Sequence, residues 1–324
     1  MRAVVVHEAG GPEVLTLEER PVPDAKPGWV LVRIHAFGLN RSELITRAGG
    51  SGDAVKFPRV LGIECVGEVV EAPDADLEPG QTFVAAMGEM GRAYDGGYEE
   101  YALLPVSQVI PVETTLGWPE LGAVPETFGT AWGSLQTLDL QPRQTLLVRG
   151  GTSSVGMAAI TLAKDAGVRV LATTRQESKR GALEANGVDH VVIDGGEIAT
   201  EVREIVPGGV DALFELVGPT TMRDSLYAVR RGGRACISGF LEDVWDVEPA
   251  REEADRVGVA FARYGSSVID VDGYRDVFQD IVRRVEAGRL RLNLDRTFTL
   301  DELPQAHRYM EANRASGKLV VLTG

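Results

Sequence analysis

The sequence of 324 residues contains only two cysteines, Cys65 and Cys236, which lie far apart in the chain. Two distant cysteines exclude a disulfide framework and a CxxC metal-binding motif, and they fit a reducing compartment. The chain also lacks an apolar run of the roughly 18 residues needed to cross a bilayer, and its first residues enter a strand pattern without the apolar region of a signal peptide. These absences predict a soluble, cytoplasmic protein with no membrane partner.

Positive charge is scarce as well. The chain has 33 Lys and Arg against 48 Asp and Glu, which gives a formal net charge of -15. Nucleic acids and anionic membranes would be repelled by this charge, so neither is expected as a partner. An anionic ligand would need a local basic pocket. Because 44% of the residues are hydrophobic, the chain can bury the core of one large or two ordinary domains.

The pattern of apolar residues changes near residue 118. Residues 1–118 hold short strand-like runs separated by glycine and proline, such as "WVLVRIHAFG" and "GIECVGEVVEA", which predict a β-rich domain. In residues 119–262, five strand-like runs alternate with helical ones at intervals of roughly 20 to 25 residues, as βαβ units require. The sequence therefore predicts an α/β fold with a doubly wound parallel sheet. Residues 263–324 predict a closing strand and two helices, of which the first places Val277, Ile281, Val282 and Val285 on one face.

A turn of small residues follows the first strand-like run of the second region. In "LVRGGTSSVGMAAITLAK" (residues 147–164), Gly151, Ser153 and Gly156 occupy the three glycine positions of the dinucleotide fingerprint G-x-G-x-x-G. Serine at the middle position adds a Cβ, but its hydroxyl can donate to a phosphate oxygen, and the N–H groups of a helix start favour an anion. An ordinary helix start is the alternative, and the four strand-like runs that follow favour a dinucleotide. The expected loop residues are Gly151, Thr152, Ser153, Ser154, Val155 and Gly156.

The end of the next strand-like run predicts which dinucleotide binds. NAD sites commonly place an acidic residue there to bind the ribose hydroxyls. Here "ATTRQESKR" places Thr174 and Arg175 at that position and Lys179 one turn further on, which favours a 2′-phosphate and therefore NADP(H). A solvated helix start is the alternative interpretation. Further cofactor-binding candidates follow the fourth and fifth strand-like runs or lie near the C-terminus, namely Val217, Gly239, Phe240 and Lys318.

The order of these elements resembles the medium-chain dehydrogenase/reductase superfamily and, within it, the zinc-free quinone oxidoreductase branch. The stretches "GPEVLTLEERPVPDAKPGWVLVRIHAFGLNRSE", "PRVLGIECVGEVVE" and "GKLVVL" carry the resemblance, which covers essentially the whole chain. It implies a GroES-like catalytic domain at residues 1–118, a Rossmann NADP(H)-binding domain at 119–262 and a return at 263–324 that completes the catalytic domain. The resemblance alone also implies a homodimer.

Zinc-dependent members of that superfamily bind the metal through a cysteine and a Gly-His-Glu motif. At the matching places this chain has Leu39 instead of the thiol and Ile63 instead of the imidazole. Glu64 is retained and is interpreted as a buried hydrogen-bonding partner rather than a ligand. Two cysteines cannot form a four-cysteine structural site either, so no metal is expected.

Without zinc, the resemblance implies hydride transfer to an acceptor in which conjugation spreads the incoming charge. Asn40 matches an asparagine placed near the nicotinamide, where its amide could bind a developing oxyanion, although a structural turn role is equally open. Thr130 matches a threonine that lines the nicotinamide pocket, with helix packing as its alternative. The sequence thus predicts an NADPH-dependent quinone oxidoreductase or enone (enoyl) reductase that acts on a small molecule. An NADPH-binding sensor or structural protein with incidental redox activity is the alternative.

Overall fold

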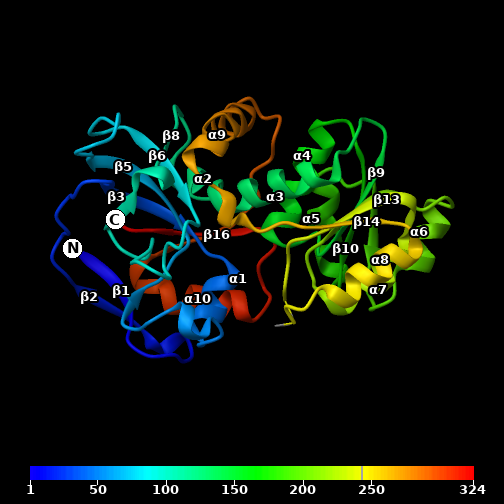
Figure 1. Ribbon diagram of the computed structural model, residues 1–324, viewed down its shortest axis with the longest axis horizontal. Helices are drawn as coiled ribbons and strands as arrows, with labels where there is room; N and C mark the ends of the chain where they lie inside the picture. Colours follow the sequence, from blue (N-terminus) through cyan, green and yellow to red (C-terminus); the bar gives the residue numbers. More distant parts are fainter. Residues whose placement is uncertain (242–243) are drawn as a thin grey trace. The chain divides into compact units, whose positions relative to one another are not determined.

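The computed structural model describes residues 1–241 and 244–324, which form two compact units (Figure 1). The first unit comprises residues 1–129, 266–288 and 294–324, and the second comprises residues 130–265 and 289–293. The sequence places domain boundaries after residues 118 and 262 instead. The first boundary differs because helix α3 (Pro125–Leu138) runs through it. Residues 289–293 pack with the second unit, in which Arg289 pairs with Asp165 (Nη2 to Oδ2, 2.9 Å).

The first unit is rich in β-structure. A seven-stranded sheet has the order β15-β16-β3-β5-β6-β8, with β7 paired to β3, and a three-stranded sheet has the order β2-β1-β4. Gly67 lies where β5 pairs with β3 at a register shift, and a Cβ there would lie 1.9 Å from the carbonyl oxygen of Arg33. The strands are β1 (Arg2–Val6), β2 (Leu15–Glu19), β3 (Trp29–Gly38), β4 (Arg59–Val60), β5 (Glu64–Glu71), β6 (Thr82–Ala86), β7 (Tyr101–Pro105), β8 (Ile110–Pro111), β15 (Leu294–Thr299) and β16 (Lys318–Leu322).

Short helices connect these strands. Helix α9 buries Ile281 and Val282 as predicted, together with Tyr274 and Phe278, whereas Val277 and Val285 are half-buried. Among the described residues, no helix is both long and apolar enough to cross a membrane. The helices of this unit are α1 (Arg41–Arg47), α2 (Trp118–Leu121), the start of α3, α9 (Val271–Glu286) and α10 (Leu303–Glu311), with 3-10 turns η1 (Pro12–Val14), η2 (Gly52–Ala54), η3 (Val106–Gln108), η5 (Ser266–Val268) and η6 (Leu300–Glu302).

The second unit is built on a parallel sheet of six strands in the order β11-β10-β9-β12-β13-β14. The five predicted strands are present, and β14 adds a sixth at the edge. Chain order reverses at β9, and in open parallel sheets ligands bind at the carboxyl ends of the strands beside such a reversal. The strands are β9 (Thr145–Arg149), β10 (Arg169–Thr174), β11 (His190–Ile193), β12 (Val210–Glu215), β13 (Val229–Ile237) and β14 (Ala260–Arg263).

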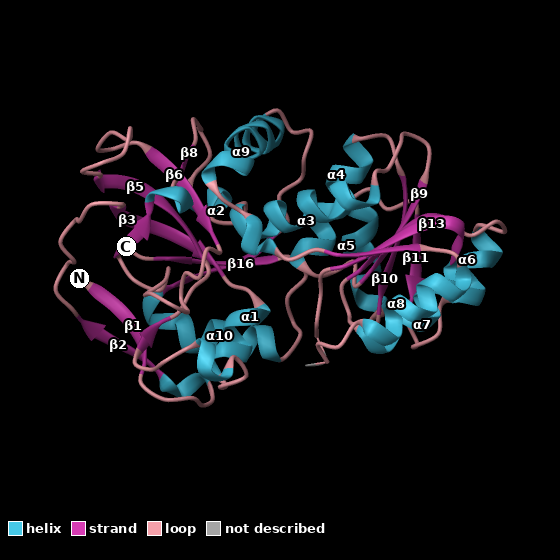
Figure 2. Ribbon diagram, in the orientation of Figure 1, coloured by secondary structure: helices cyan, strands magenta, loops and turns pink. Residues whose placement is uncertain are grey.

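Helices cover both faces of this sheet, which makes it doubly wound as predicted (Figure 2). One face packs on α6, α7 and α8 through a buried apolar cluster that contains Leu147, Leu171, Leu213 and Val192 from four adjacent strands. Helix α4 contacts β9 and β10. The helices are α4 (Ser154–Asp165), α5 (Arg180–Ala185), α6 (Ala199–Ile205), α7 (Pro219–Ala228) and α8 (Glu248–Val257), with the 3-10 turn η4 (Glu177–Lys179).

Candidate functional site

The turn between β9 and α4 has the geometry of a dinucleotide loop. A Cβ on Gly151 would lie 2.8 Å from the Cβ of Ala172, and a Cβ on Gly156 would lie 2.6 Å from the carbonyl oxygen of Gly150. Both glycines are therefore required for close packing of the loop, the helix and the neighbouring strand. Ser153 is the N-cap of α4. Serine is among the preferred residues at that position, which explains why the middle fingerprint glycine is dispensable here.

The hydroxyl of Ser153 is committed within this turn. It donates to the carbonyl oxygen of Gly150 (2.8 Å) and accepts from the N–H of Gly156 (3.1 Å). The expectation that this hydroxyl donates to a cofactor phosphate needs correction, because its hydrogen is already bound to Gly150. Within the described residues, no acceptor is bonded to the N–H groups of Ser154 and Val155. These N–H groups at the start of a twelve-residue helix can receive an anion.

Basic residues follow β10. Thr174 is buried and bonds through its Oγ1 to the backbone of Gln176, whereas Arg175 is exposed and Lys179 is half-buried in η4. Arg180, the third cation of this segment, pairs with Glu177 (Nε to Oε1, 2.5 Å). Arg175 forms no ion pair with any described residue. The segment thus presents one uncommitted guanidinium, and neither Thr174 nor Arg175 at the carboxyl end of β10 is acidic.

The turns after β12 and β13 are held together by their backbones. Leu241 donates its N–H to the carbonyl oxygen of Val217 (2.8 Å). Gly239 passes so close to the turn after β12 that a Cβ on it would lie 2.0 Å from the carbonyl oxygen of Leu216. Phe240 stacks on Trp245, with ring centroids 4.9 Å apart. Val217, Gly239 and Phe240 therefore lie at the same edge of the sheet as the β9–α4 turn.

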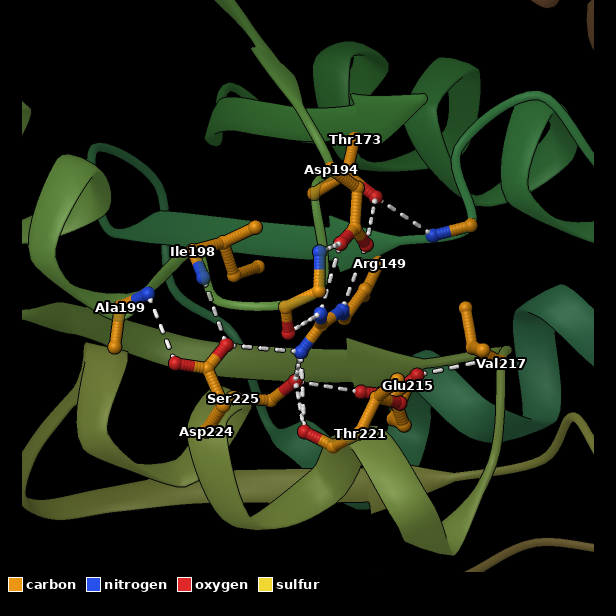
Figure 3. A network of polar contacts seen from close by, with 12 residues as sticks. Arg149, Thr173, Asp194, Ile198, Ala199, Glu215, Val217, Thr221, Asp224 and Ser225 are labelled. Atoms are coloured by element: carbon orange, nitrogen blue, oxygen red, sulfur yellow. Dashed lines mark hydrogen bonds and ion pairs between the residues drawn. The ribbon is translucent and has the colours of Figure 1, made fainter. Parts of the chain in front are cut away.

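A polar cluster that sequence analysis missed lies beneath this edge (Figure 3). We call it the Arg149 cluster; it comprises Arg149, Asp194, Glu215, Asp224 and Ser225. Arg149 ends β9 and is fully buried, and it lies in register with Glu215 at the end of β12. Its guanidinium pairs with Asp194 through two parallel bonds (2.8 and 2.9 Å) and with Asp224 (3.0 Å). The signal for this cluster was an arginine at the end of the apolar run "TLLVR", because a buried charge needs partners.

Glu215 connects the Arg149 cluster to the turn after β12. Its carboxylate accepts from the N–H of Val217 (2.9 Å) and from the hydroxyl of Ser225 (2.7 Å), which in turn accepts from Arg149 (2.9 Å). Burial raises the pKa of Glu215 to about 7. The Arg149 cluster therefore fixes the position of the Val217 backbone through Glu215.

The first unit contains a second buried polar cluster, formed by Asn40, Glu64 and Lys318. The ammonium of Lys318 lies 2.5 Å from Glu64 Oε1 and donates to Asn40 Oδ1 (2.7 Å), while Asn40 Nδ2 donates to Glu64 (2.8 Å). The other carboxylate oxygen of Glu64 accepts from the N–H of Glu126 (2.9 Å). The prediction that Glu64 is a buried hydrogen-bonding partner is confirmed. Lys318 is only 2% exposed and is bound to Glu64, so the expectation that it contacts a cofactor phosphate is corrected.

Comparison with known proteins finds two family models that match parts of this chain. Residues 26–114 match the model of the alcohol dehydrogenase GroES-like domain, and residues 186–321 match the family described as zinc-binding dehydrogenase. Human quinone oxidoreductase is 26% identical, with 99% of this chain and 98% of the relative aligned. The chain belongs to the medium-chain dehydrogenase/reductase superfamily. Its similarity to quinone oxidoreductases along the whole chain places it in their branch, as the sequence predicted.

Two further relatives show what this superfamily contains. The 2-haloacrylate reductase of a Burkholderia species is 27% identical, with 99% of this chain and 98% of the relative aligned. A solved structure described as an NAD-dependent alcohol dehydrogenase superposes with a TM-score of 0.86 at 28% identity and full coverage of both chains. Both are oxidoreductases by name. The superfamily therefore identifies the chain as an oxidoreductase, for which the turn between β9 and α4 predicts a nicotinamide cofactor.

The residues of the second unit fit such a cofactor. Gly151 and Gly156 have no room for side chains, the first N–H groups of α4 can bind a pyrophosphate, and Arg175 is available to a further phosphate. Thr130 begins the second unit within α3 and is 5% exposed. Asn40 belongs to the first unit, and its amide has partners at both atoms, which favours the structural role that the sequence left open.

The places of zinc ligands in this superfamily hold other groups here. Leu39 and Ile63 are buried apolar side chains, and Glu64 is bound to Lys318. Gly38 makes room for that pair, because a Cβ on it would lie 2.2 Å from Cε of Lys318. In the described part of the chain, no group of three or more His, Cys, Asp or Glu residues could hold a metal ion. The residues present do not fit a catalytic zinc.

Proposed function

We propose that this chain is an NADPH-dependent reductase that transfers a hydride to a quinone or an α,β-unsaturated carbonyl compound without zinc. The observation that carries the choice of cofactor is the exposed Arg175, which forms no ion pair with a described residue, at the carboxyl end of β10, where NAD sites commonly have a carboxylate. In a chain with a net charge of -15, such a cation gives the local attraction that a 2′-phosphate requires.

Each part of the cofactor site has a separate task. The Gly151–Gly156 turn and the first N–H groups of α4 hold the pyrophosphate, and Thr174, Arg175 and Lys179 surround the adenosine 2′-phosphate. Val217, Gly239 and Phe240 orient the rest of the dinucleotide at the ends of β12 and β13. When bound, the cofactor supplies the hydride. Ser153 supports this site by capping α4, which keeps the N–H groups of the first turn aligned.

A conjugated acceptor is favoured because the described residues include no group that could hold a Lewis-acid metal ion. In a quinone or an enone, the incoming negative charge spreads over the conjugated system, so that hydrogen bonds suffice to stabilise it. The names of the relatives, quinone oxidoreductase and 2-haloacrylate reductase, support this class of acceptor. Thr130 remains the proposed residue for the nicotinamide pocket. The amide of Asn40 is held in place by Glu64 and Lys318.

A panel of acceptors tests the proposal. Purified protein is mixed with NADPH and with ortho-quinones, para-quinones, enones or enoyl thioesters, and the absorbance of NADPH is followed. The proposal expects stoichiometric NADPH oxidation with at least one class and little oxidation of NADH. Binding of NADPH without oxidation by any acceptor would favour an NADPH sensor instead. The proposal also includes a cytoplasmic homodimer, which cell fractionation and light scattering would test.

A further inference from the structure

All N–H groups of the Arg149 guanidinium are bound inside the second unit, although Arg149 is the last residue of a largely apolar strand. In addition to Asp194 and Asp224, it donates to the carbonyl oxygens of Gly196 (2.7 Å) and Thr221 (3.0 Å). A fully buried arginine is costly unless every N–H has an acceptor. The structure meets this condition, so the Arg149 cluster is a built feature and not an incidental surface pair.

Asp194 lies directly beside the segment proposed to bind the 2′-phosphate. Its N–H donates to the carbonyl oxygen of Thr174 (2.9 Å), which places it next to Arg175 at the carboxyl edge of the sheet. Its carboxylate is also linked to the nucleotide loop, because it accepts from Thr173 Oγ1 (3.4 Å), which accepts from the N–H of Gly150 (3.1 Å). A carboxylate at this place would repel a phosphorylated ribose unless its charge were balanced.

We infer that Arg149 determines cofactor specificity by neutralising Asp194, so that a dinucleotide with a 2′-phosphate can bind beside a carboxylate. The inference rests on the proposed function. Without Arg149, the charges of Asp194 and Asp224 would act on the cofactor through a medium of low dielectric constant, where charges interact strongly. The binding of NADPH would be weakened more than the binding of NADH, because the 2′-phosphate of NADPH adds nearly two negative charges. Arg149 thus acts from below the site while Arg175 and Lys179 act from the surface.

Variants that remove or keep the charges of Arg149 and Asp194 test this role by measurements of cofactor binding. Dissociation constants for NADPH and NADH, and for the fragments adenosine 2′,5′-bisphosphate and AMP, are measured for the wild type, Arg149→Met, Arg149→Lys, Asp194→Asn and the double variant Arg149→Met with Asp194→Asn. Arg149→Met should reduce the preference for the 2′-phosphorylated ligand by about fivefold or more, because it removes one positive charge next to Asp194. The double variant should recover most of the preference, and Arg149→Lys should keep it because the positive charge remains.

Arg230→Met is the matched control. Arg230 pairs with Asp211 (2.8 Å), but both lie near the amino ends of β13 and β12, so the variant changes net charge equally and should leave the preference unchanged. If Arg149→Met does not fold, Asp194→Asn still decides, because it should increase the preference by about threefold or more. An unchanged ratio in Asp194→Asn, or equal losses for both cofactors in Arg149→Met, would overturn the inference while leaving NADPH as cofactor. A wild type that prefers NADH would overturn the proposed cofactor as well.

Discussion

Ser153 illustrates how a single residue can replace a fingerprint glycine. The fingerprint uses glycine at this position so that the backbone can approach a pyrophosphate. In this chain, Ser153 begins α4, and its hydroxyl bridges Gly150 and Gly156. The side chain stabilises the same turn that the missing glycine would make more flexible.

Ser153→Ala should therefore lower the free energy of unfolding of the cofactor-free protein by about 0.5 to 2 kcal/mol, the usual value of an N-cap. Ser153→Gly should lower the free energy of unfolding by only a few tenths of a kcal/mol, because glycine is tolerated at an N-cap. Urea denaturation of the three proteins without cofactor provides the measurement. Equal stability of the alanine variant and the wild type would show that the hydroxyl does not cap α4.

Lys318 and Glu64 form an ion pair that is almost completely buried, with side chains 2% and 0% exposed. Lys318→Met should destabilise the first unit by about 3 to 5 kcal/mol, because it leaves the Glu64 carboxylate buried without its cation. Lys318→Met combined with Glu64→Gln should recover a large part of this loss. Chemical denaturation of the two single variants and the double variant measures the coupling, and strictly additive losses would contradict the pairing.

At the scale of elements, the end of β10 and the turn η4 act together. A residue at a strand end and one four positions later, in the first turn that follows, can flank the same group. Arg175 and Lys179 have this spacing, and Arg180 beside them is neutralised by Glu177. Cofactor choice is thus expected to depend on two cations of this segment.

Arg175→Ala combined with Lys179→Ala should remove most of a preference for NADPH over NADH that we expect to be about thirtyfold at low salt. NADH binding should change little, since NADH lacks the phosphate. Titration calorimetry with both cofactors at low and high salt measures the effect, and the preference of the wild type should shrink as salt rises. Equal weakening of both cofactors would indicate a general field or a fold defect instead.

The free energy of unfolding is predicted to depend on pH through Glu215, whose carboxyl group holds the turn after β12. Burial raises the pKa of its carboxyl to about 7, from an ordinary value of 4.5, although Arg149 offsets part of this effect. The folded chain then binds this proton more tightly than the unfolded chain, so the stabilisation is complete below the ordinary pKa and is lost as the pH rises through about 7. The amide introduced by Glu215→Gln cannot titrate, and its oxygen can still accept from the N–H of Val217. The difference in unfolding free energy between this variant and the wild type should therefore change with pH across that window, and a constant difference would contradict the prediction.

At the scale of the whole molecule, we expect stability and activity to be independent of zinc. Leu39, Ile63 and the Glu64–Lys318 pair occupy the places where zinc-dependent members of the superfamily bind metal. Prolonged treatment with a chelator should leave the melting temperature and the NADPH oxidation rate unchanged. One zinc ion retained per chain after dialysis, with activity lost on chelation, would contradict this prediction.

The sequence by itself determined the fold class, the family and the position of the turn between β9 and α4. These features depend on local signals: the alternation of strand-like and helical runs, the small residues at 150–156 and the basic segment after β10. The missing thiol and imidazole were likewise visible at Leu39 and Ile63.

Only the tertiary structure decided what the polar residues do. Lys318 was expected at a phosphate, and Asn40 at an oxyanion or in a turn, but Glu64, more than 250 positions before Lys318, binds both. The apolar run before Arg149 indicated burial but not its partners, since Asp194 follows β11 and Asp224 lies in α7. The physical reason is that the energy of a buried charge depends on which partners surround it, and the chain brings those partners together only when it folds.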